Sequence, residues 1–267
     1  MDKELSVTGS GELDNGTTVS YKQTITDAMA FNDSEIVFGN VMGTTATLAM
    51  TSAGDPMSAI DDVTPTAFEE ANALIGSIDD VNGMDGTYGI RATMADVLGS
   101  GFKIDAMYTT DVGSGDAQAD NGTSGVDSSN ANDGKEITIT GSVPMVEGLD
   151  VGVGYYTQDG KTTVDTGTYG QDEGTVYIKY STGPVSVGYQ RGVEVDSGSN
   201  ATETQHVNDY IGISYAVSDN LTVSWNETES KRYNHAASSA LGGSAVVDTD
   251  QDLESISLSY TMGGMTI

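Results

Sequence analysis

The sequence predicts an all-β fold, an antiparallel up-and-down β-barrel that crosses a membrane. Three observations carry this prediction. Thirteen short runs alternate apolar with small or polar residues, the connections between them are tight and long in turn, and aromatic residues recur near the ends of the runs. Transmembrane barrels trim the turns on one side of the membrane and keep longer loops on the other. A soluble sandwich mixes its loop lengths and needs long Greek-key crossings.

The connections define the expected strands in order along the chain. Tight turns lie at residues 14–16, 42–44, 98–101, 143–148, 182–184, 218–220 and 261–265. Long connections lie between them, at residues 27–34, 53–85, 111–134, 159–174, 193–207 and 231–251. This alternation predicts that consecutive strands are neighbours and that all the long loops lie at one end of the barrel.

A period of two places alternate side chains of each run on opposite faces of the strand. One set is apolar and the other is rich in Gly, Ser, Thr and Asn. With only 4 Phe and 1 Trp, the chain has little material for an apolar core, so the apolar set is expected to face lipid and the polar set water. The residues expected to face lipid include Val151, Val153, Ile211, Ile213, Val223, Ile256 and Leu258.

Aromatic residues of the apolar set favour two membrane interfaces. Near the tight turns lie Tyr180, Tyr215 and Tyr260. Near the long loops lie Tyr88, Tyr108, Tyr155, Tyr189 and Trp225. Rings of amphipathic aromatics at both ends of an apolar band are typical of a membrane-spanning barrel. The alternative is that Tyr is simply a common strand residue.

Composition narrows the function classes. The chain has 10 Lys and Arg against 40 Asp and Glu, a net charge of −30, which makes nucleic acid an unfavourable partner. No apolar run reaches the roughly 20 residues of a membrane helix. His206 and His235 are expected to be solvated in long loops, and no Cys or His cluster has zinc spacing, so we expect no enzyme and no cofactor. Which metal the acidic loops attract stays open, because loose association of divalent cations is all that their charge predicts.

Several strand–turn–strand segments carry a family resemblance: residues 11–16 (GELDNG), 42–44 (MGT) and 214–223 (SYAVSDNLTV). Together the chain resembles the general diffusion porins of Gram-negative outer membranes, especially the alphaproteobacterial type, over essentially its whole length. The resemblance implies a 16-stranded barrel that forms a homotrimer in outer-membrane lipid and lets small hydrophilic solutes diffuse passively. Thirteen strands and the start of a fourteenth at residues 266–267 are present, so residues 1–267 are expected to form one barrel domain that lacks the first strand and the last strands.

The resemblance makes residues 53–85 the third outer loop, which the family folds into the lumen as a constriction. A helix is expected within it at residues 66–75, where Thr66 can cap a first turn that holds acidic residues. The acids expected at the constriction are Asp61, Asp62, Glu69, Glu70, Asp79 and Asp80. The bases expected on the facing wall are Lys22, Arg91, Lys103 and Lys179.

Opposite charges across a narrow pore would set its ion preference, and the excess of acids predicts a preference for cations. The alternative for each charge is an ordinary solvated side chain. The alternative for the whole chain is a soluble, acidic, secreted β-rich adhesin or surface-layer module.

Overall fold

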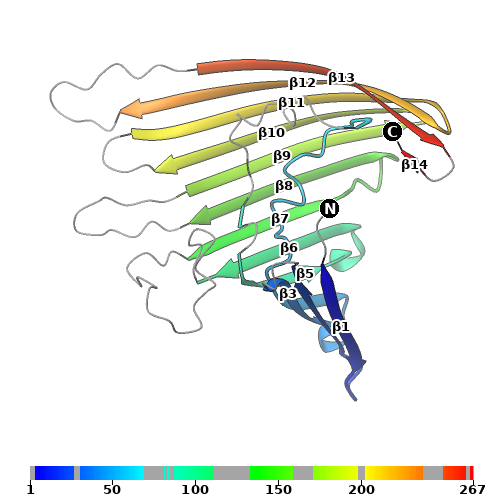
Figure 1. The fold of residues 1–267 in the computed structure, drawn as a ribbon, viewed down its shortest axis with the longest axis vertical. Coiled ribbons are helices and arrows are strands. Elements are labelled where there is room, and N and C mark those ends of the chain that lie inside the picture. The colour runs from blue at the N-terminus through cyan, green and yellow to red at the C-terminus, as the bar shows by residue number, and fades with distance from the viewer. Residues whose placement is uncertain are drawn as a thin grey trace.

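Fourteen antiparallel strands form one sheet whose spatial order follows the order of the chain (Figure 1). The structure is a computed structural model and describes residues 4–26, 31–68, 81, 83–84, 87–110, 133–158, 171–197, 202–236, 249–262 and 265–266. The first seven strands are β1 (Leu5–Glu12), β2 (Thr18–Ile25), β3 (Phe31–Gly39), β4 (Ala46–Thr51), β5 (Gly89–Met94), β6 (Phe102–Thr109) and β7 (Gly134–Ser142). The others are β8 (Leu149–Gln158), β9 (Gln171–Thr182), β10 (Val185–Ser197), β11 (Thr202–Ser218), β12 (Leu221–Ala236), β13 (Thr249–Met262) and β14 (Met265–Thr266).

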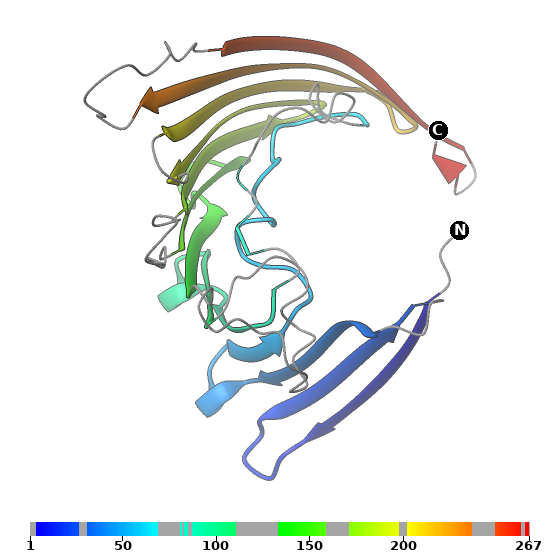
Figure 2. The same cartoon turned by 60° about the vertical axis from the view of Figure 1, so that its left-hand side comes forward.

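The sheet curls into most of a barrel (Figure 2). Each strand is hydrogen-bonded to the next along the chain, and in the part that the structure describes no ladder joins β1 to β13 or β14. The predicted up-and-down meander is therefore confirmed, with thirteen full strands and a short fourteenth. No helix among the residues described here is both long and apolar enough to cross a membrane.

The predicted tight turns from residues 14–16 to 218–220 lie where the pattern placed them, and residues 263–264 of the last one lie outside the described residues. Between β1 and β2, Gly16 adopts φ +83°, a left-handed conformation that favours glycine, and the Asn15 side chain accepts a hydrogen bond from Thr17 N. Two other tight connections contain short 3₁₀ helices, η1 (Val41–Gly43) and η2 (Val97–Gly99). Turn chemistry at single residues thus sets the hairpin register.

Burial is inverted relative to a soluble protein. The outward apolar side chains are exposed, for example Val153 at 48 %, Ile213 at 43 % and Leu258 at 55 %. On the opposite face of the sheet, polar side chains are buried, such as Thr138 at 1 % and Asn226 at 2 %. Exposed apolar residues on β1 to β11 and on β13 match a lipid-facing surface, so the outward assignment of the apolar set agrees with the fold.

The predicted loop bounds need correction on the β10–β13 side. Residues 193–207 are not a long connection, because β10 continues to Ser197 and β11 begins at Thr202, with Ser197 opposite Glu203. The period of two continues through Val193 and Val195, and backbone pairing continues with it. His206 therefore lies on β11 and is 8 % exposed, so it is not a solvated loop residue as expected. His235 also lies within a strand, β12.

The predicted short helix is absent over its described part. Thr66 is coil and the two residues after it form a bend, while residues 69–75 lie outside the described residues. The first of the long connections is also shorter than expected, since β3 begins at Phe31.

Candidate functional site

Residues 52–68, which we call the inner segment, lie along the polar face of the curled sheet. Figure 2 shows this part of the chain, in cyan, running inside the curve of the strands. The segment leaves β4 and reaches side chains of β10, β12 and β13. It therefore crosses much of the inward face, and its contacts fall into four groups along its length.

The base of the inner segment is tied to an ion cluster on the wall. Arg91 on β5 makes a bidentate pair with Asp105 on β6, with Nε–Oδ1 2.9 Å and Nη2–Oδ2 2.7 Å. Arg91 Nη1 also donates to the carbonyl of Gly54, 3.3 Å away. Lys103 Nζ lies 3.4 Å from Asp105 Oδ2, and Asp105 is only 1 % exposed. One buried carboxylate thus serves two of the predicted wall bases.

An apolar cluster comes next, between the segment and the wall. It consists of Met57, Val81, Met84, Met107 and Tyr156, each at most 3 % exposed. Met57 lies over Gly154 of β8, where a Cβ would overlap the Met57 sulfur and lie 2.9 Å from Ile60 Cδ1. The absence of a side chain at Gly154 lets the segment lie directly on the strand.

Gln190 on β10 holds the middle of the segment. Its side chain is fully buried, and its amide nitrogen donates to the carbonyls of Ile60 at 2.8 Å and Asp61 at 2.6 Å. Its amide oxygen accepts from the Val63 backbone N–H at 2.9 Å. One wall side chain therefore satisfies three backbone groups of a segment that has no secondary structure of its own.

The far end of the segment is fixed around Pro65. A Cβ at Gly188 would lie 2.5 Å from Pro65 Cδ, and one at Gly212 would lie 2.7 Å from Pro65 O. Asn226 Nδ2 donates to that same carbonyl at 3.1 Å. Next to it, Ala67 N donates to Ser224 Oγ at 2.9 Å. Hydrogen-bond donors and acceptors on β12 and bare backbone on β10 and β11 together hold this end.

The predicted constriction acids fall into two groups. Asp62 is exposed and Asp61 is half-exposed, both beside the Gln190 anchor. Glu69, Glu70, Asp79 and Asp80 lie outside the described residues.

The predicted wall bases also differ among themselves. Arg91 and Lys103 share Asp105, whereas Lys22 and Lys179 face inward without an ion pair to any residue described here. In the register Lys22 lies opposite Glu35, and Lys179 lies opposite Asp150. The structure therefore brings Arg91 and Lys103 together and leaves the other two apart.

Sequence reasoning missed three residues of this site: Asp105, Glu136 and Gln190. All three are polar, lie on the inward face and are at most 4 % exposed. Their position in the inward set was a usable signal, since a long polar side chain near mid-strand can reach an inward-folded loop. The register and the path of the inner segment were needed to show what each one contacts.

The aromatic residues predicted for the two interfaces lie on the outward face. Their exposures run from 37 % at Tyr189 to 49 % at Tyr155 for the seven tyrosines, and Trp225 is half-buried. The tyrosines near the tight turns are staggered: Tyr180 is opposite Val187 of β10, whereas Tyr215 is opposite Val185, two residues away on the same strand. A stagger of this kind is expected when barrel strands tilt.

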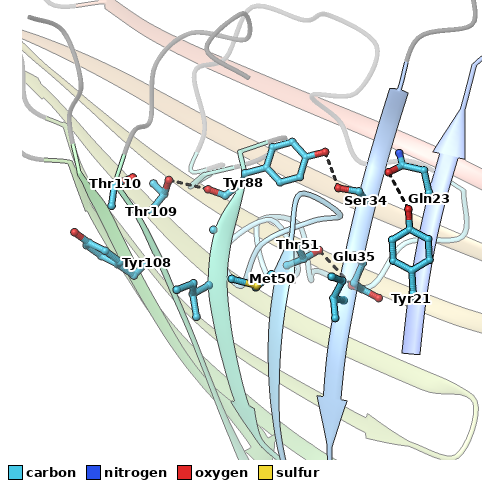
Figure 3. Close-up of a pocket in the computed structure, with 13 residues that line it drawn as sticks. Tyr21, Gln23, Ser34, Glu35, Met50, Thr51, Tyr88, Tyr108, Thr109 and Thr110 are labelled. Atoms are coloured by element: carbon cyan, nitrogen blue, oxygen red, sulfur yellow. Dashed lines mark hydrogen bonds between the residues drawn. The ribbon is translucent and has the colours of Figure 1, made fainter. Parts of the chain in front are cut away.

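A hollow of about 390 Å³ lies at the long-loop end of β2–β6. Figure 3 shows Tyr21, Tyr88 and Tyr108 around it, with Met50 between them. Tyr88 Oη accepts a hydrogen bond from Ser34 Oγ at 2.7 Å, so its oxygen already has a partner within the chain. Met50 is 56 % exposed and belongs to the outward set, which places apolar surface at the floor of the hollow.

Comparison with known proteins agrees with this architecture. A family model described as Gram-negative porin matches residues 1–267. No curated protein matches the chain. Among solved structures, the outer-membrane expressed OmpT of Vibrio cholerae is similar at a TM-score of 0.64 and 11 % identity, covering 97 % of this chain and 74 % of that one. A trimer form of in-vitro folded OmpT from Vibrio cholerae is similar at 0.63 and 9 % identity, covering 98 % and 76 %.

At 9–11 % sequence identity the solved structures show only the fold, and membership of a family is shown by the family model. The alternative of a soluble adhesin or surface-layer module does not hold, because the apolar set faces outward and the family match spans the chain. The chain belongs to the Gram-negative porin family and is a porin of the bacterial outer membrane.

Proposed function

We propose that the protein forms a water-filled channel through which small hydrophilic solutes and ions diffuse passively. The observation that carries the proposal is the inner segment, anchored by hydrogen bonds across the polar face from Gly54 to Ala67. A segment held there narrows the space that the curled sheet encloses. Its Asp62 is exposed on that side, so the narrow region presents charge as well as a steric limit.

The channel is proposed to prefer cations. Acids outnumber bases by 40 to 10 in the chain, and the inner segment contains no Lys or Arg. Two of the four wall bases, Arg91 and Lys103, are offset by Asp105. Fixed negative charge on the lumen raises the local cation concentration and repels anions. No enzymatic activity and no cofactor are part of this proposal.

The test is the reversal potential of the full-length protein in planar bilayers under a salt gradient. Replacing Asp61 and Asp62 by Asn should shift the reversal potential toward anions, and replacing Glu69 and Glu70 by Gln should do the same if they line the constriction. Asp14→Asn removes one charge in a tight turn away from the inner segment and serves as the control.

Salt dependence provides a second check on the same channel. The shift should shrink as salt rises, because the Debye length falls to about 3 Å at 1 M. Anion preference in the unmodified protein, or equal reversal potentials in all variants, would remove the proposed role of these acids.

We further propose that the protein assembles as a homotrimer in outer-membrane lipid and that the hollow on β2–β6 takes part in the contact. A solved trimer form of a protein with this fold supports a trimer. Pockets walled by aromatic residues are common anchor sites at interfaces, since a partner side chain can fill them and exclude solvent. The exposed Ile90, beside Met50 in the register, lies in this surface.

Ile90→Gln should lower the trimer fraction seen in unheated detergent gels while the heat-modifiable monomer remains. Ile178→Gln is the control, since it makes the same change on the outward face of β9. Ile178 is 48 % exposed and Ile90 is 47 % exposed, and the control variant should leave the trimer intact. Equal loss of trimer in both variants would show that the effect comes from the lipid-facing surface in general.

A further inference from the structure

Two carboxyl groups, one on the inner segment and one on the wall beneath it, lie together without a cation between them. Glu136 on β7 is 4 % exposed and Asp55 of the inner segment is 2 % exposed. Both meet at Gly83, where a Cβ would overlap Glu136 Oε2 and lie 2.8 Å from Asp55 Oδ1. The two side chains therefore approach one another around a single point.

The carboxylate oxygens of this pair are only partly satisfied by hydrogen bonds. Asp55 Oδ1 accepts from the backbone N–H groups of Met57 at 2.8 Å and Ser58 at 2.9 Å. Asp55 Oδ2 and both Glu136 carboxylate oxygens are buried and have no well-aligned hydrogen bond in the described part of the chain, although the Met84 backbone N–H points to Glu136. Buried carboxylate oxygens without donors are strongly unfavourable, so a group that would satisfy them is missing from this arrangement.

The groups around the pair supply little positive charge and few hydrogen-bond donors to the two carboxylates. Met57, Met84 and Tyr156 form apolar walls around the pair. Arg91 on β5 faces it, but its guanidinium is already bidentate with Asp105 of β6. From β8 and β9, Tyr156 and Glu173 complete the titratable neighbours.

Glu173 is itself satisfied, since it accepts hydrogen bonds from Gly83 N and Gln171 Nε2. It therefore adds negative charge beside the pair without supplying a donor. Three carboxylates so close together disfavour full ionisation of all of them.

We propose that Glu136 is a positioning residue that carries a proton and donates it in a hydrogen bond to Asp55, which holds the base of the inner segment on β7. This inference rests on the proposed channel function. One proton turns an unpaired buried oxygen into a donor and removes one of two adjacent negative charges. When alkaline solution takes the proton, two carboxylates face each other in an apolar site, and the repulsion lifts the segment from the wall.

A proton fits the site better than a metal ion does. Calcium takes six to eight oxygen ligands and magnesium requires a near-octahedral set. Here Glu136 and Asp55 converge, the neighbouring Glu173 already accepts two hydrogen bonds, and the residues packed around them are mostly methionine, valine and tyrosine side chains. Among the residues that the structure describes, no group of three or more acidic, His or Cys side chains could hold a metal.

The experiment measures how the accessibility of the inner segment to a thiol label changes with pH in the full-length, refolded protein. Met57→Cys reports lifting, because Met57 is fully buried, and Ala59→Cys is an exposed reference on the same segment. The ratio of their labelling rates cancels the ordinary increase in thiolate reactivity. Between about pH 6 and pH 10 this ratio should rise by up to about tenfold per pH unit once the proton is lost.

Variants in the same background separate positioning from simple packing. Glu136→Gln keeps a permanent donor to Asp55 and should hold the ratio low at every pH. Glu136→Ala removes the donor and should raise the ratio at every pH. Glu35→Gln is the matched control, since Glu35 also lies on the inward face but already accepts a hydrogen bond from Thr51, and it should behave like the unmodified protein.

Three results would overturn the proposal. One is the same pH profile in Glu136→Gln as in the unmodified protein. Another is a ratio that does not change with pH. The third is a ratio that responds to calcium or a chelator and not to pH, which would make a bound cation the occupant. Because labelling does not require conduction, a protein without channel activity would refute the proposed function and still decide this inference.

Discussion

Removing the Gln190 side chain should release the middle of the inner segment while the barrel stays folded. Gln190→Ala deletes the contacts to Ile60 O, Asp61 O and Val63 N, at 2.8, 2.6 and 2.9 Å. A hydrogen bond contributes about 0.5–1.5 kcal/mol net, and a buried group left without a partner costs about 1–3 kcal/mol. Water entering the gap satisfies part of this loss, so docking of the segment should weaken by roughly 2–4 kcal/mol.

A loss of this size raises the undocked population by about 30-fold to about 700-fold, since each 1.4 kcal/mol is tenfold. The expected results are increased open-channel noise in planar bilayers and faster proteolysis between β4 and β5. The heat-modifiable migration of the barrel should be unchanged. This separation follows because backbone pairing of β10 with β9 and β11 does not involve the side chain.

Gln158→Ala is the matched control, since Gln158 is also an inward glutamine but accepts its hydrogen bond from Tyr156 and not from the inner segment. Unchanged noise and unchanged proteolysis in Gln190→Ala would refute the reasoning, because they would show that the segment is held without this residue.

Three further predictions concern the wall and the loops. Val153→Arg should cost about 2–4 kcal/mol of folding free energy in lipid if Val153 lies near the midplane, and an unchanged folding equilibrium would remove its outward assignment. Gly212→Ala should disturb the inner segment, because its Cβ would lie 2.7 Å from Pro65 O. Gly174→Ala is the control and should be tolerated, since the nearest atom to its Cβ would be 3.9 Å away. Equal open-channel noise in the two variants would contradict this prediction. Replacing residues 111–134 by a four-residue turn should leave barrel assembly intact, as judged by heat modifiability, because the deleted run is mostly Gly, Ser, Asn and Asp and has little apolar surface to lose.

The strands and their faces could be predicted because the information is local. A period of two fixes the face of Val153 without knowledge of any other strand, and a turn such as residues 14–16 fixes the next hairpin. The ends of β10 and β11 could not be predicted in the same way. Polar residues such as His206 resemble loop residues in the sequence, yet on β11 this side chain is buried at 8 % exposure.

The site required contacts between distant parts of the chain. Arg91 has the inward position that the pattern predicts, but its charge is matched by Asp105, which the register places on the next strand beside it. Gln190 meets Ile60 across 130 positions of sequence. The period of a strand says which face a side chain occupies and nothing about the route of a loop over that face.

The inverted burial of this chain reverses the usual expectations for mutational tolerance. In a soluble domain, trimming a buried valine is costly and replacing an exposed threonine is harmless. Here a conservative change at the exposed Val153 only exchanges one hydrocarbon for another against lipid tails, whereas Thr138, 1 % exposed on the inward face, is enclosed by its neighbours. Surveys of variants should therefore find the tightest constraints on small polar residues. Methods that score stability by buried hydrocarbon would rank the positions of this protein in nearly the opposite order.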